Sequence, residues 1–227
     1  MTLLHRTGNY HILSRIGAGR YGVCYLARDD ISGRTVALKR FRSRIYGRKR
    51  PPNAEEAVIL SSLEHECLPE LLGILNTRKG YFFILEYMEG TSLEKLLFRR
   101  KKRFEDAEIF RIGSQLLTLL VYLHKRHIVH RDISIANVLD NGEQVFLIDF
   151  GLAQFSDDFS SDWESFGNLL LYLLYSSYEG KTGGAWYEEL TLSPEKTTCL
   201  KRLLGLAPPF SDTEEILLAF SSCFAVP

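Results

Sequence analysis

Three oxygen-bearing side chains in one loop-rich stretch constrain this sequence more than any other feature. Asp132 ends the string His130-Arg131-Asp132, Asn137 follows five residues later, and Asp149 opens the string Asp149-Phe150-Gly151. Short strands and loops are expected over 126–161, so the three side chains lie between helical segments. Carboxylate and amide oxygens suit Mg²⁺, a hard cation that prefers oxygen ligands.

A glycine-rich string near the N-terminus is the second constraint. Residues 17–23 read Gly-Ala-Gly-Arg-Tyr-Gly-Val, a GxGxxG pattern that a strand–turn–helix dinucleotide site also produces. A second strand, and not a helix, is expected after Gly22. This favours a hairpin whose glycines let backbone amides approach a triphosphate closely. An ordinary hairpin turn is the alternative for this string taken alone.

A lysine ends the next apolar strand, Val36-Ala37-Leu38-Lys39. The amine of Lys39 can lie over the phosphates of a nucleotide if a carboxylate holds it. Glu56, in a helix expected over 54–63, is the candidate partner, and Glu55 is its neighbour. A solvated lysine and a helix-surface glutamate are the alternatives for these residues in isolation.

Strand patterns dominate the first third of the chain, and helical patterns dominate the remainder. The change falls near Met88-Glu89-Gly90, where a hinge is expected between an N-lobe over 10–88 and a C-lobe over 89–227. The two lobes are predicted to form a single domain over 1–227. Strands are expected over 10–16, 23–27, 35–38 and 81–87, and helices over 54–63, 91–98, 104–125, 161–175, 193–204 and 212–224.

Taken in order, these motifs resemble the motif set of the protein kinase family. The segment Leu85-Glu86-Tyr87-Met88 also resembles the hinge of that family, and the resemblance covers residues 10 to 175. It implies an α+β, bilobal kinase-like fold with a β-rich N-lobe and a reduced helical C-lobe. The chain looks like the short bacterial or archaeal Ser/Thr kinases that lack most of the activation segment and its Ala-Pro-Glu motif.

The resemblance implies a role for each motif residue in phosphoryl transfer from Mg-ATP. Asp132 would orient the attacking hydroxyl or accept its proton, and Asn137 and Asp149 would hold magnesium ions. Lys39, paired with Glu56, would contact the α- and β-phosphates. The positions implied to bind or cover the nucleotide are Gly17, Gly19, Gly22, Val23, Ala37, Lys39, Glu86, Met88 and Leu139.

The sequence departs from the family pattern in two places. Ser134 stands where Ser/Thr kinases place a lysine, and Ala136 stands where tyrosine kinases place an arginine. Losing one charge stabiliser costs roughly 10²–10³ in rate, and Arg20 is one candidate to replace it. Only twelve residues separate Asp149 from Asp162. Control by activation-loop phosphorylation is therefore not expected, and Asp162 is expected to brace the catalytic-loop backbone.

Two basic runs, 40–50 and 99–103, stand out in a chain whose formal net charge is zero. They indicate either docking of an acidic partner, RNA or an anionic membrane, or a solvated charged loop. Too few aromatic residues accompany the runs to predict a nucleic-acid site by base stacking. Four scattered cysteines favour a reducing compartment. Because no signal peptide or transmembrane segment is recognised, a cytoplasmic protein is expected.

Three classes of function remain open. The favoured one is a Ser/Thr protein kinase that transfers the γ-phosphate of ATP to a protein hydroxyl, its own included. A small-molecule kinase is the alternative, although the C-terminal region is short for the helices that shape a small-molecule pocket. The third class is an ATP-binding regulatory scaffold with weak catalysis. The presence of Lys39, Asp132 and Asp149 argues against that third class.

Overall fold

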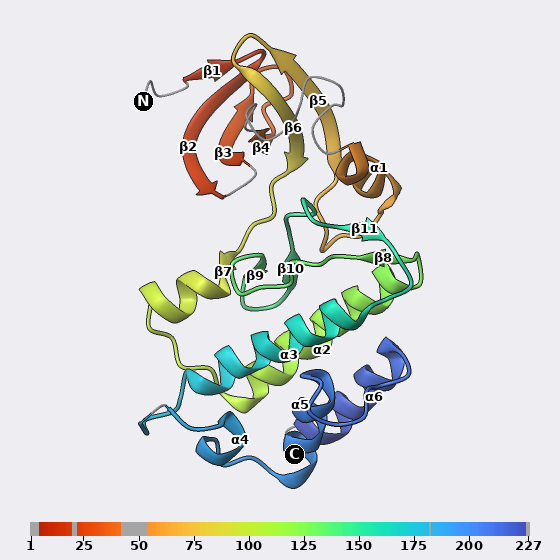
Figure 1. The fold of residues 1–227 in the computed structure, drawn as a ribbon. Coiled ribbons are helices and arrows are strands. Elements are labelled where there is room, and N and C mark those ends of the chain that lie inside the picture. Colours follow the sequence, from red (N-terminus) through yellow and green to blue (C-terminus); the bar gives the residue numbers. More distant parts are fainter. Residues whose placement is uncertain (1–4, 20–21, 42–53, 182, 226–227) are drawn as a thin grey trace. The chain divides into compact units, whose positions relative to one another are not determined.

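The computed structural model describes residues 5–19, 22–41, 54–181 and 183–225. The chain divides into two compact units, Met1–Met88 and Glu89–Pro227 (Figure 1). None of the described helices is long and apolar enough to cross a membrane.

The first unit is built on a six-stranded antiparallel sheet with the strand order β1-β2-β3-β4-β6-β5. Its core is a cluster on one face, in which Tyr25 and Ala27 of one strand pack with Val36 and Leu38 of the next. These apolar side chains alternate along their strands, because successive residues of a strand point to opposite faces. The elements are β1 (Arg6–Thr7), β2 (Tyr10–Ala18), β3 (Gly22–Asp29), β4 (Thr35–Phe41), α1 (Ala54–Ser62), β5 (Leu71–Thr77) and β6 (Gly80–Glu86).

Strand β5 is an element that the sequence patterns do not predict. Its sequence, Leu71-Leu72-Gly73-Ile74-Leu75-Asn76-Thr77, is an apolar run broken by a glycine and lacks the period-two alternation of a half-buried strand. The strand forms because β6 offers it a partner, with a register irregularity between Leu71 and Gly73. Pairing with a neighbour therefore overrides the weak local pattern.

The second unit is mainly helical, and α2 and α3 run alongside each other through it (Figure 1). Their shared interior is apolar, with Leu116, Leu120, Phe166 and Leu170 all fully buried. The helices are α2 (Asp106–His124), α3 (Ser160–Tyr175), α4 (Trp186–Glu189), α5 (Pro194–Leu203) and α6 (Thr213–Phe224), and the small strands are β7 (Thr91–Ser92), β8 (Ile128–Val129), β9 (Val138–Asp140), β10 (Val145–Leu147) and β11 (Gln154–Phe155).

Capping side chains begin the longer helices where the sequence predicts them. A capping box joins Glu105 and Glu108 at the start of α2. Ser193 accepts a hydrogen bond from the Lys196 N–H before α5, and Asp212 accepts one from the Glu215 N–H before α6. The observed bounds of α2, α3, α5 and α6 agree with the expected ranges to within two residues.

The prediction of a helix over 91–98 is wrong at its start. Residues Thr91–Ser92 form strand β7, which pairs with β9, and the π-helix η1 (Lys95–Arg99) follows. The Ser92 hydroxyl accepts a hydrogen bond from the Lys95 N–H, so this residue terminates the strand and caps the next turn. The pairing with β9 is a long-range contact that no local pattern reports.

A glycine allows α2 and α6 to pack closely. A Cβ atom added to Gly113 would lie 2.3 Å from Cζ of Phe220. That ring is fully buried and stacks against Phe110 and Phe224, so it has no room to move. The next residue, Ser114, has a buried hydroxyl that finds no hydrogen-bond partner among the described residues.

We expect Gly113→Ala to destabilise the protein and the adjacent Ser114→Ala to leave it as stable or more stable. Overpacking costs about 1–3 kcal/mol, which outweighs the ~1 kcal/mol that alanine contributes through helix propensity. Ser114→Ala removes an unsatisfied hydroxyl and costs no hydrogen bond. Urea unfolding followed by circular dichroism measures both free energies. Equal midpoints for the two variants would contradict the tight contact with Phe220.

Candidate active site

A buried ion pair lies in the first unit. Lys39 is at the end of β4 and Glu56 is on the inner side of α1, and their side chains are 5% and 2% exposed. The Lys39 ammonium donates to Glu56 Oε1 at 2.5 Å. Glu55, the other candidate partner, is exposed. Burial of a charge is tolerated only with a partner, so the helix is positioned by this contact.

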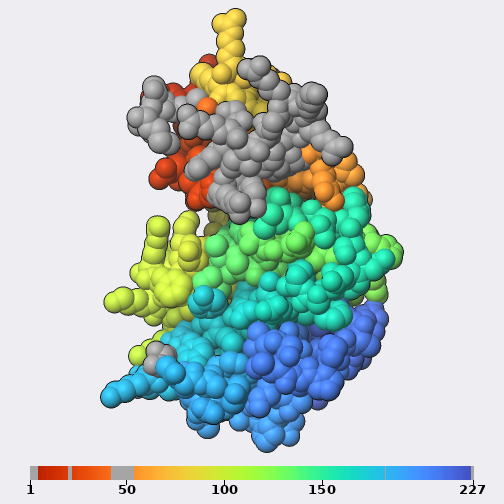
Figure 2. All heavy atoms as spheres, viewed as in Figure 1, coloured from red at the N-terminus to blue at the C-terminus, as the bar shows by residue number. Residues whose placement is uncertain are grey.

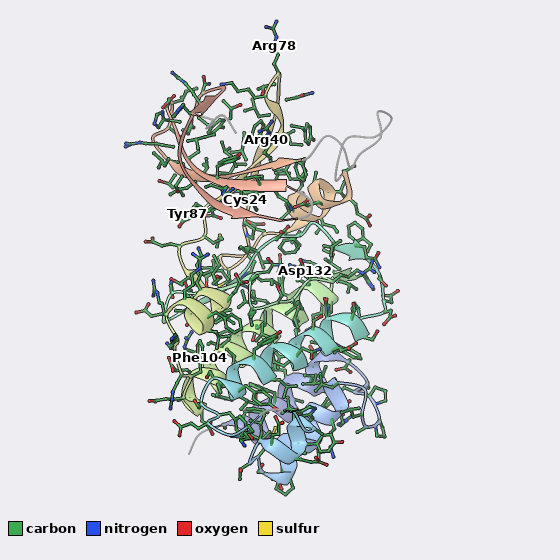
Figure 3. The ribbon with its side chains drawn as sticks, turned by 60° about the vertical axis from the view of Figure 1, so that its left-hand side comes forward. Cys24, Arg40, Arg78, Tyr87, Phe104 and Asp132 are labelled. Carbon is green, nitrogen blue, oxygen red and sulfur yellow. The ribbon has the colours of Figure 1, made fainter. Side chains whose placement is uncertain are left out.

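The strand register places Cys24, and not Val23, on the same face as this lysine. Cys24 is opposite Lys39, while Val23 is opposite Arg40 (Cys24 and Arg40 are labelled in Figure 3). Directly opposed residues of an antiparallel pair share a face. Ala37, two residues before Lys39, lies on that face as well.

Val23 instead packs against the core cluster of the first unit. The expectation that Val23 faces a nucleotide together with Ala37 is therefore corrected. The physical reason is the period of two in a strand, because a shift of one residue moves a side chain to the other face. Cys24 takes the place that sequence reasoning assigned to Val23.

The three glycines of the motif differ in what they require. A Cβ on Gly22 would lie 2.3 Å from the Arg40 carbonyl oxygen, so the approach of β3 to β4 excludes any side chain there. Gly17 and Gly19 have room for a Cβ within the described residues. The Gly19 N–H donates to the Gly22 carbonyl and closes the hairpin. Arg20, the candidate replacement cation, lies outside the described residues.

The remaining positions expected around a nucleotide belong to both units. Glu86 ends β6, and its N–H donates to the Glu70 carbonyl. Met88 is buried and is the last residue of the first unit. Leu139 lies in the centre of β9, in the second unit.

The second unit brings the catalytic-loop residues together. The Asn137 amide nitrogen donates to both the backbone oxygen and the Oδ2 of Asp132, each at 2.9 Å. Two acceptors on one side identify that atom as the nitrogen, so the amide oxygen points elsewhere. The Ile148 N–H donates to the Asn137 carbonyl at 2.9 Å, which places Asp149 next to this pair.

The backbone is strained at the same residues. Arg131 and Asp149 have φ angles of 64° and 66°, and His127 before the loop has 57°. A non-glycine residue in this left-handed region costs on the order of 1–3 kcal/mol. The Asp149 conformation is supported by a hydrogen bond from the Gly151 N–H to its Oδ1. Such strain persists where the surrounding structure imposes a side-chain direction.

A fully buried carboxylate supports this strained backbone. Asp162, in the first turn of α3, accepts hydrogen bonds from the backbone N–H groups of His130 and Arg131, both at 2.7 Å. The prediction that Asp162 braces the catalytic loop is confirmed. Two charge-assisted bonds to adjacent amides fix the direction in which the next residue, Asp132, leaves the loop.

The brace continues to the C-terminal helix through a chain of hydrogen bonds. His124 Nε2 lies 3.1 Å from Asp162, and its Nδ1 lies 2.6 Å from the Thr213 hydroxyl. Because a carboxylate only accepts, Nε2 donates to Asp162, and Nδ1 forms the hydrogen bond with the Thr213 hydroxyl. The same hydroxyl accepts from Trp163 Nε1 at 2.9 Å. Sequence reasoning missed Thr213, since nothing local marks the first residue of α6 as a partner of α2.

His130 is held neutral inside the unit. Burial lowers its pKa, because the charged form loses hydration that nearby carboxylates only partly replace. Its Nδ1 accepts a hydrogen bond from the Asp132 N–H, and its ring lies edge-on against Phe150 at 4.8 Å between centroids. The ring therefore helps to position the backbone of Asp132, in addition to the bonds that Asp162 makes with the two preceding residues.

The short segment after Asp149 is fixed to the catalytic unit. Strand β11 pairs with β8, and the Ser156 N–H donates to the His127 carbonyl. The Arg131 guanidinium donates to Gln154 Oε1 at 2.8 Å, so this arginine makes a contact within the chain. A second arginine closes the corner between α5 and α6, where Arg202 bonds to the Pro208 and Pro209 carbonyls and to Glu215.

The Arg202 corner was not foreseen from the sequence. Hydrogen bonds from the Ser211 N–H and from Arg202 lower the pKa of Glu215 to about 2. The pattern Leu206-Ala207-Pro208-Pro209-Phe210 contains no arginine, and Arg202 reaches it from the preceding helix. The corner orients α6, whose first residue is Thr213.

We expect Thr213→Val to destabilise the protein by about 1–3 kcal/mol, because the buried His124 Nδ1 and the part-buried Trp163 Nε1 both lose their hydrogen-bond partner. Thr118→Val is the matched control, since the Thr118 hydroxyl is exposed on α2 and bonds only to its own helix. Urea unfolding measures both variants. If Thr213→Val and Thr118→Val unfolded at the same urea concentration, the hydrogen bonds of Thr213 would not stabilise the protein and the prediction would be wrong.

Comparison with known proteins identifies protein kinases as relatives of this chain. The family model described as a protein kinase domain matches residues 10–172. Probable serine/threonine-protein kinase YbdM of Bacillus subtilis is 34% identical over 220 residues, which cover 91% of this chain and 86% of that protein.

Two further relatives cover less of their own length. Cyclin-dependent kinase 1 of Encephalitozoon cuniculi is 33% identical over 65% of this chain and 51% of the relative. CTD kinase subunit alpha of Schizosaccharomyces pombe is 32% identical over 79% of this chain and 30% of the relative. The family model and the Bacillus relative both cover most of this chain, which therefore belongs to the protein kinase family and has its bilobal α+β fold.

Proposed function

We propose that this protein kinase binds Mg-ATP and transfers the γ-phosphate to a serine or threonine hydroxyl of a protein, its own included. The observation that carries the proposal is the buried Lys39–Glu56 pair. A buried ammonium that serves only stability is often no better than an apolar side chain, so its presence favours a role toward an anion. On the face it shares with Ala37 and Cys24, that anion is the phosphate chain of a nucleotide.

The donor set of the second unit suits magnesium. Asp149 supplies a carboxylate, and Asn137 supplies the amide oxygen that its bonds to Asp132 leave available. Mg²⁺ commonly takes one or two protein oxygens and completes its shell with water and phosphate. Within the described residues, no group of three or more His, Cys, Asp or Glu side chains could hold a metal by itself.

Asp132 is proposed to orient the attacking hydroxyl. Its backbone is held by His130 and its side chain by Asn137, so one carboxylate oxygen has a fixed direction. Bound Mg-ATP would supply the transferable phosphate and the neutralising charge, and the protein would supply alignment. The carboxylate would accept the hydroxyl proton as the hydroxyl oxygen bonds to the γ-phosphorus and the bond from that phosphorus to the leaving oxygen of ADP breaks.

The missing lysine at Ser134 is proposed to slow this reaction without preventing it. In the structure the Ser134 carbonyl accepts hydrogen bonds from the Asn137 and Val138 N–H groups, so the residue shapes the loop through its backbone. No cation replaces the lysine in the catalytic loop itself. A rate lower by roughly 10²–10³ than that of a kinase with this lysine follows from the lost charge stabilisation.

We expect Asp132→Asn to reduce Mg-dependent phosphate transfer from γ-labelled ATP by at least about 10²-fold, the usual contribution of a positioned base. Asparagine keeps an oxygen for Asn137 but is not basic, so the loop is retained. Transfer is measured to the chain itself and to a generic protein acceptor. Asp30→Asn, on the exposed β3–β4 turn, serves as the control and keeps full activity.

Two results would contradict the proposal. Transfer by Asp132→Asn close to the wild-type rate would remove Asp132 from its role. If the wild type binds ATP but labels no protein, the acceptor is a small molecule or the chain is a regulatory scaffold. Omission of Mg²⁺ distinguishes these cases from a preparation that is inactive for other reasons.

We also expect the affinity for a nucleotide to show whether Cys24 or Val23 faces it. Cys24→Trp should weaken binding of a fluorescent ATP analogue by more than about tenfold, a loss of roughly 1.4 kcal/mol, because the indole fills the face beside Ala37. Cys24→Val should bind as the wild type does. Val23→Thr should retain nucleotide affinity and lower the melting temperature, since it places a hydroxyl in the core. The reverse ranking would restore Val23 to the nucleotide face.

A further inference from the structure

We propose that the surface formed by Phe98, Tyr172 and the cations Arg99, Arg100 and Lys101 docks an acidic segment of the protein substrate. We call it the η1 surface. The segment would place an aromatic or aliphatic side chain on the two rings and carboxylates on the three cations. Docking at this surface would give the proposed kinase a substrate class. Only the phosphate-transfer assay below rests on the proposed function, because peptide binding is measured without ATP.

The aromatic part of the η1 surface comes from two elements. Phe98 of η1 is 62% exposed and Tyr172 of α3 is 50% exposed. Their rings meet edge to face, with centroids 6.4 Å apart and planes at 88°. Two large apolar side chains that contact each other and remain this open form a patch, and such patches commonly mark a binding site.

The cationic part is a subset of the basic run 99–103. Lys102 pairs with Glu108 at 2.6 Å, and Arg103 pairs with Glu179 at 2.7 Å. The side chains of Arg99, Arg100 and Lys101 are exposed and form no ion pair or side-chain hydrogen bond with the described residues. The run therefore divides into cations that hold the fold and cations that face solvent beside Phe98. Carboxylates complement this second group, since arginine binds them with two parallel bonds.

The segment that carries these cations has a defined conformation. The Arg100 N–H donates to the Lys95 carbonyl at 3.0 Å, and the Lys102 N–H donates to the Leu96 carbonyl at 2.9 Å. Between them Lys101 has a φ of 51°, a left-handed conformation. A strained turn held at both sides presents its side chains in one arrangement, which lowers the entropy lost on binding.

Both elements of the η1 surface are anchored at the catalytic loop. The Glu94 N–H donates to the Ile135 carbonyl at 2.7 Å, one turn before Phe98. At the other side, the first turn of α3 holds the loop through Asp162. Figure 2 shows the yellow-green η1 segment projecting on the same face as the cyan part of α3.

The length of α3 sets the spacing of the substrate. From Asp162 to Tyr172 the helix rises about 15 Å at 1.5 Å per residue. An extended peptide covers that span in about five residues. We therefore expect the acceptor hydroxyl and the apolar anchor to be about five residues apart.

An acidic protein segment fits this surface better than RNA or a membrane does. Three cations without an ion pair among the described residues make a short site, whereas binding to a nucleic-acid backbone draws on many phosphate contacts. The chain has no formal net charge, and Glu164 on α3 and Glu179 beside Arg103 interrupt the positive surface.

The test measures binding of two labelled peptides by fluorescence anisotropy, without ATP. One peptide has a serine, a phenylalanine five residues away and glutamates beside the phenylalanine, and the other has glutamines in place of the glutamates. The triple variant Arg99→Glu, Arg100→Glu, Lys101→Glu should bind the acidic peptide about tenfold more weakly, the sum of three exposed ion pairs. Phe98→Ala should lose about as much. The triple variant Arg15→Glu, Arg28→Glu, Arg34→Glu has the same charge change on exposed sites of the other unit and should bind as the wild type does.

Equal binding of the two peptides, or equal losses in the two triple variants, would overturn the proposal. Binding to vesicles with phosphatidylserine and to a polyuridylate RNA is assayed in parallel. If the Arg99, Arg100 and Lys101 triple variant loses binding only to the vesicles or only to the RNA, the η1 surface binds that ligand and not an acidic peptide. Addition of Mg-ATP then distinguishes the docking proposal from the kinase proposal. Peptide binding without phosphate transfer would support docking at the η1 surface and contradict the proposed kinase activity. Equal phosphate transfer to both peptides would support the kinase activity and contradict docking at the η1 surface.

Discussion

The second unit depends on one buried carboxylate, that of Asp162. It is fully buried and accepts hydrogen bonds from two consecutive catalytic-loop amides and from His124. A carboxylate in such a place is tolerated only because each oxygen is satisfied. The loop, α2, α3 and, through Thr213, α6 are therefore joined at one point. This contact sets the direction of Asp132, the residue that follows the second of these amides.

A short chain keeps these anchors and does without a long activation segment. The residues after Asp149 pair with β8, and Arg131 bonds to Gln154 within the unit. In the first unit the Lys39–Glu56 pair is formed without any modified residue. Each of these contacts forms within its own unit, between residues of the unmodified chain. Tyr172 of the η1 surface, on α3, is half exposed.

Sequence patterns identified most of the fold and the residues of the candidate site. Helices α2, α3, α5 and α6 follow from apolar periodicity, and α2, α5 and α6 also have capping residues; both signals are local. Strand β5 and the β7–η1 segment could not be predicted from local patterns. Strand β5 is stabilised by pairing with β6, and β7 is stabilised by pairing with β9. Among the site contacts, Thr213 and Arg202 were missed for the same reason. Their partners lie on other helices, and no spacing in the sequence marks them.

The sequence by itself determined the family and the chemical groups: a lysine, a glutamate, two aspartates and an asparagine in a fixed order. These groups are recognisable because phosphoryl transfer requires charge and oxygen ligands of specific kinds. The tertiary structure alone decided which side chains share a face, as with Cys24 and Val23, and which cations of the run 99–103 stay unpaired. Both depend on strand register and on contacts between distant elements. Such contacts form only when the chain is folded, because their energy comes from burial and from partners that are far apart in the sequence.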